Sequence, residues 1–217
     1  MAKKKFKLKH YISYIAVIIF LIVTVFMASS GSLNRSTQNL ITQISYSIIL
    51  AVSLNLVIGF LGELSLGHAG FMCVGAYLGC FLANNLHSVM DSPLLILIIS
   101  MLAGGLIAAV FGFIIGLPAL RLKGDYLAIV TLAFGEIVRT IFKNLKVFGG
   151  ALGLSTKKYG SDLFIVALIV VLIMLVLIQN LVRSKHGRAI TAIRDNEIAA
   201  KAMGINVTFY KLLVFVI

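Results

Sequence analysis

Long apolar runs alternate with short polar segments along the whole chain. Each run approaches the about 20 residues that an α-helix needs to cross the hydrocarbon core of a bilayer. Six such runs lie at residues 11–29, 40–60, 67–84, 94–117, 126–142 and 162–182, and a seventh begins near residue 207. The last letters, KLLVFVI, stop inside that seventh run. The pattern predicts an all-α polytopic membrane protein with about six to seven transmembrane helices, in a chain that is C-terminally truncated.

The amino-acid composition is also typical of a membrane protein, and this affects the interpretation of the positive net charge. The 217 residues are 60% hydrophobic and 12% charged, with a formal net charge of +12. A soluble domain carries roughly twice that charged fraction. The basic residues lie between the apolar runs, where they set topology and contact anionic lipid head groups. We therefore predict the lipid bilayer as a partner and no nucleic acid.

The distribution of Lys and Arg predicts the orientation. The first nine residues hold five lysines, so residues 1–10 are predicted to be a basic cytoplasmic N-terminus. Alternation of the spans then places the basic segment 183–206 on the same side, in agreement. The loop 143–161 also carries four lysines but falls on the outside. Either this loop is an exception or one span is re-entrant, and the Gly-rich span 67–84 is the weakest.

A cluster of glycines and polar residues interrupts the chain between the second and third runs. The stretch GFLGELSLGHAG, residues 59–70, carries Glu63, Ser65 and His68. A helix broken here would expose backbone groups, which is tolerated at membrane depth only inside protein or beside a water-filled cavity. His68 is a candidate switch or ligand, but we favour a histidine that makes one hydrogen bond inside the bundle.

Two pairs of glycines have the spacing that brings membrane helices close together. Gly75 and Gly79 form one small-xxx-small pair, and Gly112 and Gly116 form the other. Such pairs are explained either by plain helix packing or by a role in the transport pathway. Cys73 and Cys80 lie in the same run with no metal-ligand spacing around them, so we predict no metal site.

Charged residues also lie inside the fifth run. Glu136 follows Asp125 by eleven residues, or about 16 Å along a helix, which is near the middle of a bilayer. Arg139 is three residues further, so the two side chains can meet on one face. Charges at that depth usually face the bundle interior or an aqueous cavity. The pair, with Thr131, either lines a pathway or forms an internal ion pair, unless Arg139 snorkels to the far interface.

The polar segment before the last run is predicted to be a short helix, a turn and a new span. Its small and apolar positions recur on one side of a helix at Ala189, Ile193, Asn196, Ala200 and Met203. Gly204 is a helix-stop residue, and Asn206 or Thr208 is positioned to cap the next helix. The small side chains suit a docking surface for another protein.

Three stretches resemble one family of membrane transporters. They are SLGHAGFMCVGAY, LRLKGDYLAIVTLAFGEIVR and SKHGRAITAIRDNEIAAKAMGIN. All three resemble the permeases of branched-chain amino acid ABC importers, specifically the LivM-type subunit, and the resemblance covers residues 40–206. The third is similar to the EAA loop of ABC importer permeases, the cytoplasmic helix that fits a groove in the ATPase. Glu197 stands one residue further from Ala199 and Ala200 than in the common EAA pattern.

The resemblance implies a type II ABC importer permease in a bacterial cytoplasmic membrane. Residues 11–217 would form a single transmembrane permease domain with a coupling loop at 183–206. The implied partners are ATP-binding subunits, a second related permease of the LivH type and an extracytoplasmic binding protein that delivers leucine, isoleucine or valine. This chain would need no cofactor and would bind no ATP, and the sequence GxxxxGK[ST] of a nucleotide-binding loop is absent from it.

The same resemblance assigns candidate residues by position. The ATPase-coupling candidates are Gly187, Arg188, Arg194, Asp195, Asn196, Glu197, Ala199, Ala200 and Gly204. The pathway or packing candidates are Ser65, His68, Gly70, Tyr77, Asp125, Thr131 and Glu136.

Other functions compete with this interpretation. A secondary transporter would use Glu136 or His68 for ion coupling and would not depend on an ATPase or on residues 186–206. A membrane-embedded enzyme would use His68 and Glu63, but no second histidine or nucleophile stands near them, so we predict that the chain is not an enzyme. A permease of the same type carrying urea or short amides is a third alternative, because a hydrophobic pathway discriminates weakly between small substrates.

Overall fold

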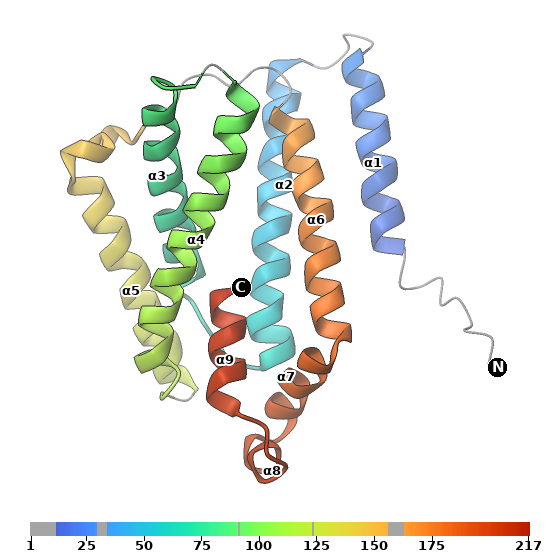
Figure 1. Cartoon of the computed structure of the whole chain (residues 1–217), viewed down its shortest axis with the longest axis vertical. Coiled ribbons are helices and arrows are strands. Elements are labelled where there is room, and N and C mark those ends of the chain that lie inside the picture. Colours follow the sequence, from blue (N-terminus) through green and yellow to red (C-terminus); the bar gives the residue numbers. More distant parts are fainter. Residues whose placement is uncertain (1–11, 30–33, 91, 123, 156–162) are drawn as a thin grey trace, which may run out of the picture. The chain divides into compact units, whose positions relative to one another are not determined.

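The structure is a computed structural model that describes residues 12–29, 34–90, 92–122, 124–155 and 163–217 (Figure 1). Within these residues all regular secondary structure is helical. In chain order the α-helices are α1 (Ile12–Ser29), α2 (Arg35–Asn55), α3 (His68–Leu86), α4 (Pro93–Ala119), α5 (Asp125–Asn144), α6 (Leu163–Arg183), α7 (Lys185–Asp195), α8 (Glu197–Ala202) and α9 (Val207–Val216). A π-helix, η2 (Leu56–Leu61), continues α2, and two short 3₁₀ turns, η3 (Lys146–Phe148) and η4 (Gly150–Leu152), follow α5. The predicted basic N-terminus, residues 1–10, lies outside the described residues.

Each predicted apolar run coincides with a helix. The largest difference in bounds is at α2, which begins at Arg35 rather than near residue 40. Its first turn is polar, and apolarity marks only the part of a helix that lies in lipid. Among the described residues, four helices are long and apolar enough to cross a bilayer, namely Arg35–Leu61, α3, α4 and α6. The total of six to seven spans therefore stays a prediction.

The chain divides into two compact units. Unit 1 comprises residues 1–52 and 159–181, and unit 2 comprises residues 53–158 and 182–217. In unit 1, Ile41 of α2 packs against Phe164 and Leu168 of α6, with Leu21 of α1 beside them. All the candidate site residues belong to unit 2.

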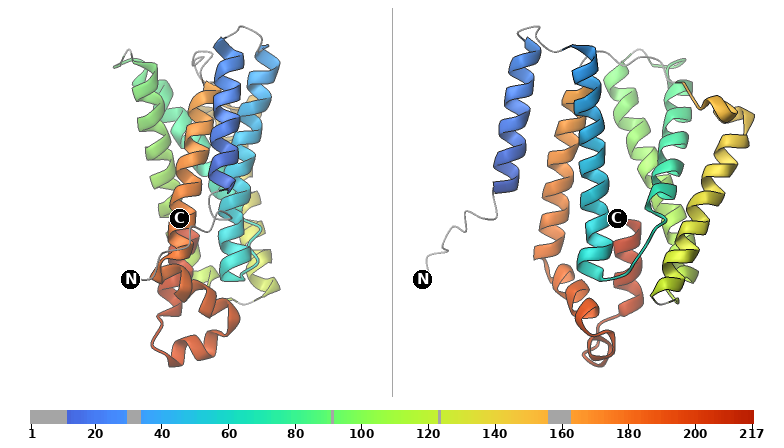
Figure 2. Two further views of the ribbon diagram at one scale, coloured as in Figure 1. Left: turned by 90° about the vertical axis from the view of Figure 1, so that its right-hand side faces the viewer. Right: turned by 180° about the vertical axis from the view of Figure 1, so that it is seen from behind.

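Helix α3 is the central element of unit 2, with α4 on one side and α5 on the other (Figure 2). The small-xxx-small pair in α3 forms its contact with α4. A Cβ atom added at Gly104 would come 2.5 Å from the carbonyl oxygen of Gly75, and one added at Gly79 would come 3.0 Å from that of Ser100. The two backbones therefore touch, as the glycine spacing predicted.

The second glycine pair receives α9. A Cβ atom at Gly112 would lie 3.2 Å from the carbonyl oxygen of Phe215, and one at Gly116 would lie 3.0 Å from Leu212. Both small-xxx-small pairs are thus packing surfaces. They hold α9 against α4 and fix the place of the segment that precedes α9.

Candidate functional site

The predicted break between α2 and α3 is present in unit 2. The π-helix η2 ends α2, and residues 62–67 are irregular before α3 begins at His68. Gly62 follows the π-helix with φ +80°, a conformation that favours glycine. A side chain there would also collide with Arg194, because an added Cβ would lie 2.6 Å from the Arg194 Cγ atom. We call residues 56–67 the interhelix break.

Arg194 ties the 183–206 segment to this break. Its Nη1 donates a hydrogen bond of 2.9 Å to the carbonyl oxygen of Gly59, inside the π-helix. The final carbonyls of a helix lack partners within it and need donors from elsewhere. Arg194 is also paired with its neighbour Asp195 at 3.0 Å. The guanidinium therefore joins two parts of the sequence that lie 135 positions apart.

A buried lysine makes a second connection at the same place. Lys211 of α9 is only 4% exposed and forms ion pairs with Glu63 of the interhelix break and Glu197, the first residue of α8. The Lys211 Nζ lies 3.3 Å from the Glu197 carboxylate. A buried charge is tolerated when it is paired and hydrogen-bonded. We call Glu63, Lys211 and Glu197 the lysine network.

The sequence analysis did not single out Lys211. It lies at the start of an apolar run, where a lone lysine is itself a signal of an internal partner. Its partners are 148 and 14 positions away, however, and no local periodicity connects them.

The 183–206 segment differs from the single helix that was predicted. It forms two helices, α7 and α8, that meet at Asn196. Asn196 is extended, with φ −158° and ψ 103°, and its side-chain oxygen accepts a hydrogen bond from the Ala199 N–H. The predicted shared face through Ala189, Ile193, Asn196, Ala200 and Met203 is therefore wrong, because an N-cap interrupts the helical period.

The C-terminal end of the segment follows the prediction, and its N-terminal end has a cap that the sequence analysis did not single out. Ser184 caps α7 by accepting hydrogen bonds from the N–H groups of His186 and Gly187. Gly204, with φ +80°, follows α8 in the conformation typical of a helix stop. Asn206 caps α9 by accepting from the Phe209 N–H at 3.1 Å.

The coupling candidates divide between an inner and an outer surface. Gly187 and Ala200 are buried inside unit 2 and Glu197 belongs to the lysine network, so these three pack or pair within the chain. The exposed candidates are Arg188, Arg194, Asp195, Asn196, Ala199 and Gly204. Beside them Ile198 is 80% exposed and Met203 is 83% exposed. Figure 1 shows that α8 lies at the tip of unit 2, beyond the N-terminal end of α9.

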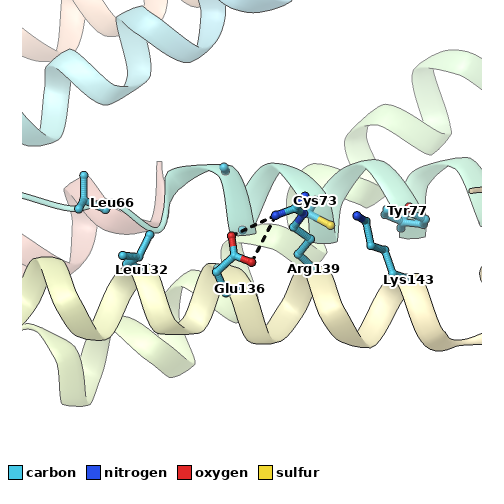
Figure 3. A pocket seen from close by; sticks show the side chains of 10 residues that line it. Leu66, Cys73, Tyr77, Leu132, Glu136, Arg139 and Lys143 are labelled. Atoms are coloured by element: carbon cyan, nitrogen blue, oxygen red, sulfur yellow. Dashed lines mark hydrogen bonds and ion pairs between the residues drawn. The ribbon is translucent and has the colours of Figure 1, made fainter. Parts of the chain in front are cut away.

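A pocket of about 340 Å³ lies between α3 and α5 (Figure 3). The helices that form it cross closely, because a Cβ atom added at Gly70 would come 2.7 Å from the Gly135 Cα atom. The lining residues are Leu66, Ala69, Gly70, Cys73, Tyr77, Leu132, Gly135, Glu136, Arg139 and Lys143. Three of the predicted pathway candidates, Gly70, Tyr77 and Glu136, thus share one cavity.

The predicted Glu136–Arg139 pair exists and lies in this pocket. Arg139 Nη1 is 3.3 Å from both carboxylate oxygens of Glu136. The Arg139 side chain is 58% exposed and that of Glu136 is 61% exposed. Figure 3 shows both side chains, and that of Lys143, projecting from α5 toward α3. The pocket therefore holds ionised groups of both signs.

Other candidates build the walls around the pocket. Thr131 is fully buried, accepts a hydrogen bond from the Leu66 N–H at 3.0 Å and donates to the Ala128 carbonyl. Tyr77 stacks on Phe142 with ring centroids 4.9 Å apart. Ser65 is buried, 4% exposed, in the loop before Leu66.

The remaining candidates lie away from the pocket lining. His68 is hydrogen-bonded to Ser53, with its Nε2 2.7 Å from the hydroxyl oxygen, which is the single interaction that the sequence analysis favoured. Asp125 is the first residue of α5, where a negative charge suits the helix dipole. His68 and Glu63 engage different partners, so the geometry offers no support for the enzyme alternative.

With this geometry in place, the chain can be compared with known proteins. A sequence family described as "Branched-chain amino acid transport system / permease component" matches residues 36–217. The chain belongs to this family. It is consequently a multi-pass membrane protein of the permease family, and the helical fold fits that class.

Individual relatives agree with the family. The chain is 35% identical to the high-affinity branched-chain amino acid transport system permease protein LivM of Salmonella typhimurium and to that of Escherichia coli, in each case over 96% of this chain and 54% of the relative. It is 28% identical to a probable LivM permease of Methanocaldococcus jannaschii over 72% of this chain and 56% of the relative. The chain therefore spans about half the length of the curated relatives it matches. No solved structure matches the chain.

Proposed function

We propose that the protein is a permease subunit of a type II ABC importer that moves leucine, isoleucine and valine across the bacterial cytoplasmic membrane. The observation that carries this proposal is the family match over residues 36–217, together with relatives that are named as branched-chain amino acid permeases. Six to seven spans and a cytoplasmic N-terminus are part of the proposal. So is a single permease domain over residues 11–217.

The proposed transporter needs further subunits. ATP-binding subunits supply the energy, a second related permease completes the pathway, and an extracytoplasmic binding protein delivers the amino acid. In this scheme the chain needs no cofactor and binds no ATP. The membrane part of each permease responds to ATP through the surface that meets the ATPase.

The 183–206 segment is the proposed coupling loop. Its outer surface at α8 presents Ile198 and Met203, which are large, apolar and exposed in an otherwise polar part of unit 2. Exposed apolar side chains of this kind mark contact sites for other proteins. Arg194 and Asp195 would border that contact, and the partly exposed Glu197 would face both the ATPase and the lysine network.

The inner surface of the same segment supports its role in transmission. Arg194 holds the Gly59 carbonyl, and the lysine network joins α8 to Glu63 and α9. A displacement of α8 by the ATPase would therefore move the interhelix break. Because the break includes Leu66, which lines the α3–α5 pocket, and leads directly into α3, the motion would reach that pocket.

The proposed transport activity is tested by uptake in cells that lack this gene. Radiolabelled leucine, isoleucine, valine and urea are supplied with and without the full-length protein restored. We expect restored uptake of the three aliphatic amino acids and loss of that uptake with an ATPase-dead partner. Uptake that ignores the ATPase would instead indicate a secondary transporter, and rescue of urea alone would change the substrate class.

The coupling loop is tested by charging its outer surface. The double variant Ile198→Asp, Met203→Asp should abolish co-purification of the ATPase and reduce leucine uptake at least tenfold, since an unpaired charge in a protein contact costs several kcal/mol. The matched control is Val147→Asp in η3. Val147 is also exposed, at 63%, but it lies just after the C-terminal end of α5 and outside the 183–206 segment. Normal assembly and uptake in the double variant would remove 183–206 from the coupling role.

A further inference from the structure

We infer that the α3–α5 pocket is a binding site for the zwitterionic head and aliphatic side chain of one α-amino acid. This inference rests on the proposed function and deepens it, because it places the substrate on particular residues of this chain. The pocket volume of about 340 Å³ lies in the range of small-molecule sites, about 300–1,000 Å³.

The ionised groups of the pocket are arranged in order along α5. Glu136, Arg139 and Lys143 follow one another at about one helical turn, on the face that lines the pocket. The two cations, Arg139 and Lys143, thus lie at one end of the pocket, and the anion Glu136 lies next to Arg139. An α-amino acid carries a carboxylate and an ammonium group on the same carbon. Its carboxylate matches Arg139 and Lys143 while its ammonium group matches Glu136.

The end of the pocket beyond Glu136 is apolar. Leu132 lies one turn before Glu136 on α5, and Leu66 faces it from the interhelix break (Figure 3). Ala69, in the first turn of α3, also lines the pocket. An aliphatic side chain fits there whether it is that of leucine, isoleucine or valine, because no polar group specifies its shape. The cations, the anion and the apolar wall therefore offer one partner each to the carboxylate, the ammonium group and the side chain that share the α-carbon of the amino acid.

The Glu136–Arg139 pair is suited to exchange partners with such a ligand. Both hydrogen bonds from Arg139 Nη1 are long, at 3.3 Å, and both side chains are more than half exposed. Exposed pairs of this kind contribute little to stability. A ligand that carries both charges replaces one ion pair by two, without leaving either residue unpaired.

The walls of the pocket keep these groups in place. Thr131 anchors the Leu66 backbone, the Tyr77–Phe142 stack holds the far end, and Gly70 against Gly135 fixes the spacing of the helices. A preformed cavity with few charged groups at fixed positions is typical of small-molecule sites. This arrangement also predicts that urea and short amides, which have neither a carboxylate nor an ammonium group, bind weakly here.

Binding to the purified, fully assembled transporter tests the inference without the binding protein. The probes are radiolabelled leucine, 4-methylpentanoate, which lacks the ammonium group, and 3-methylbutylamine, which lacks the carboxylate. We expect leucine to bind at least tenfold more tightly than either analogue, because each analogue leaves one charged group without its partner. Equal binding of leucine and one analogue would overturn the zwitterion site.

Substitutions locate the site on these residues. Arg139→Gln and Glu136→Gln should each weaken leucine binding about tenfold, whereas Lys146→Gln, just after the end of α5 and outside the pocket lining, should not change it. Unchanged binding in both pocket variants would place the leucine elsewhere and reject the inference. If these variants do not assemble, a measurement on protein with an unsubstituted pocket tests the inference instead.

That measurement uses Cys73, whose side chain lines the pocket beside Arg139 (Figure 3). In a protein with Cys73 as its only cysteine, saturating leucine should slow alkylation by N-ethylmaleimide at least fivefold, and equal urea should not. An alkylation rate that leucine leaves unchanged would overturn the inference. Failure of the proposed function is recognised separately, because unsubstituted protein would then restore no uptake of leucine, isoleucine or valine.

Discussion

Lys211 and Arg139 are both cations paired with glutamate in unit 2, but they lie in opposite surroundings. The Lys211 side chain is 5% exposed and joins α9 to the preceding helix α8 and to the interhelix break, 148 positions away. The Arg139 side chain is 58% exposed and pairs with a residue one turn away on its own helix. A buried charge that loses its partner pays the full desolvation penalty, whereas an exposed charge regains water. The lysine network is therefore a fixed connection between α8, α9 and the interhelix break, whereas the Glu136–Arg139 pair is accessible to a ligand.

This difference matches the places of the two clusters in the molecule. The lysine network lies where the 183–206 segment, the interhelix break and α9 meet, so that movement of one part must move the others. The Glu136–Arg139 pair lies in a cavity, where rigid pairing would compete with any substrate. Four predictions test how far the contrast holds.

The largest effect is expected at Lys211. Lys211→Met leaves Glu63 and Glu197 without their shared cation and should lower the free energy of unfolding by roughly 3–5 kcal/mol. Unfolding of the purified protein in detergent measures this change. The matched control, Lys201→Met in α8, removes an exposed lysine and should change the free energy by less than about 0.5 kcal/mol. If the two variants lowered the free energy of unfolding by similar amounts, the lysine network would not be a fixed connection.

A charge-free version of the network separates stability from transmission. The triple variant Glu63→Gln, Lys211→Met, Glu197→Gln leaves no unpaired charge and should recover most of the lost stability. If the ion pairs transmit motion from α8, uptake in this variant stays low although the protein is stable. Full uptake would reduce the network to a packing feature.

A smaller effect is expected where α3 and α5 cross beside the pocket. Gly70→Ala places a methyl group about where a Cβ would lie 2.7 Å from the Gly135 Cα, and should lower the free energy of unfolding by about 1–3 kcal/mol. In Gly135→Ala the nearest atom lies 3.8 Å from the new Cβ, so this control should be tolerated. Leucine binding should also weaken in the Gly70→Ala variant. Equal behaviour of the two would mean that this crossing does not set the pocket.

The sequence predicted the parts of this comparison that depend on local spacing. Apolar runs gave the helices because burial in lipid requires continuous apolar length. The spacing of Glu136 and Arg139 predicted their pairing, and the glycine pairs predicted close helix contacts, since both follow from the helical period. Gly204 and Asn206 predicted the turn before α9 from their intrinsic backbone preferences.

The parts that the sequence missed depend on contacts between distant residues. In the sequence Lys211 lies within an apolar run, and only the folded structure shows that Glu63 and Glu197 are its partners. The hydrogen bond from Arg194 to the Gly59 carbonyl has no periodic signature either. The break at Asn196 was signalled locally, because asparagine is a preferred N-cap, but the regular spacing of small residues favoured one helix instead.

The smallest effect is expected at the Glu136–Arg139 pair. Arg139→Gln should change the free energy of unfolding by less than about 1 kcal/mol, because both side chains of the pair are more than half exposed in this structure and exposed ion pairs contribute little to stability. A double-mutant cycle with Glu136→Gln isolates the interaction, and we expect a coupling energy of about 0.2–1 kcal/mol in the absence of leucine. A value above about 2 kcal/mol would show that the pair is desolvated in the assembled transporter. The two clusters would then be alike, and Glu136 and Arg139 would not be free to exchange their bond for a ligand.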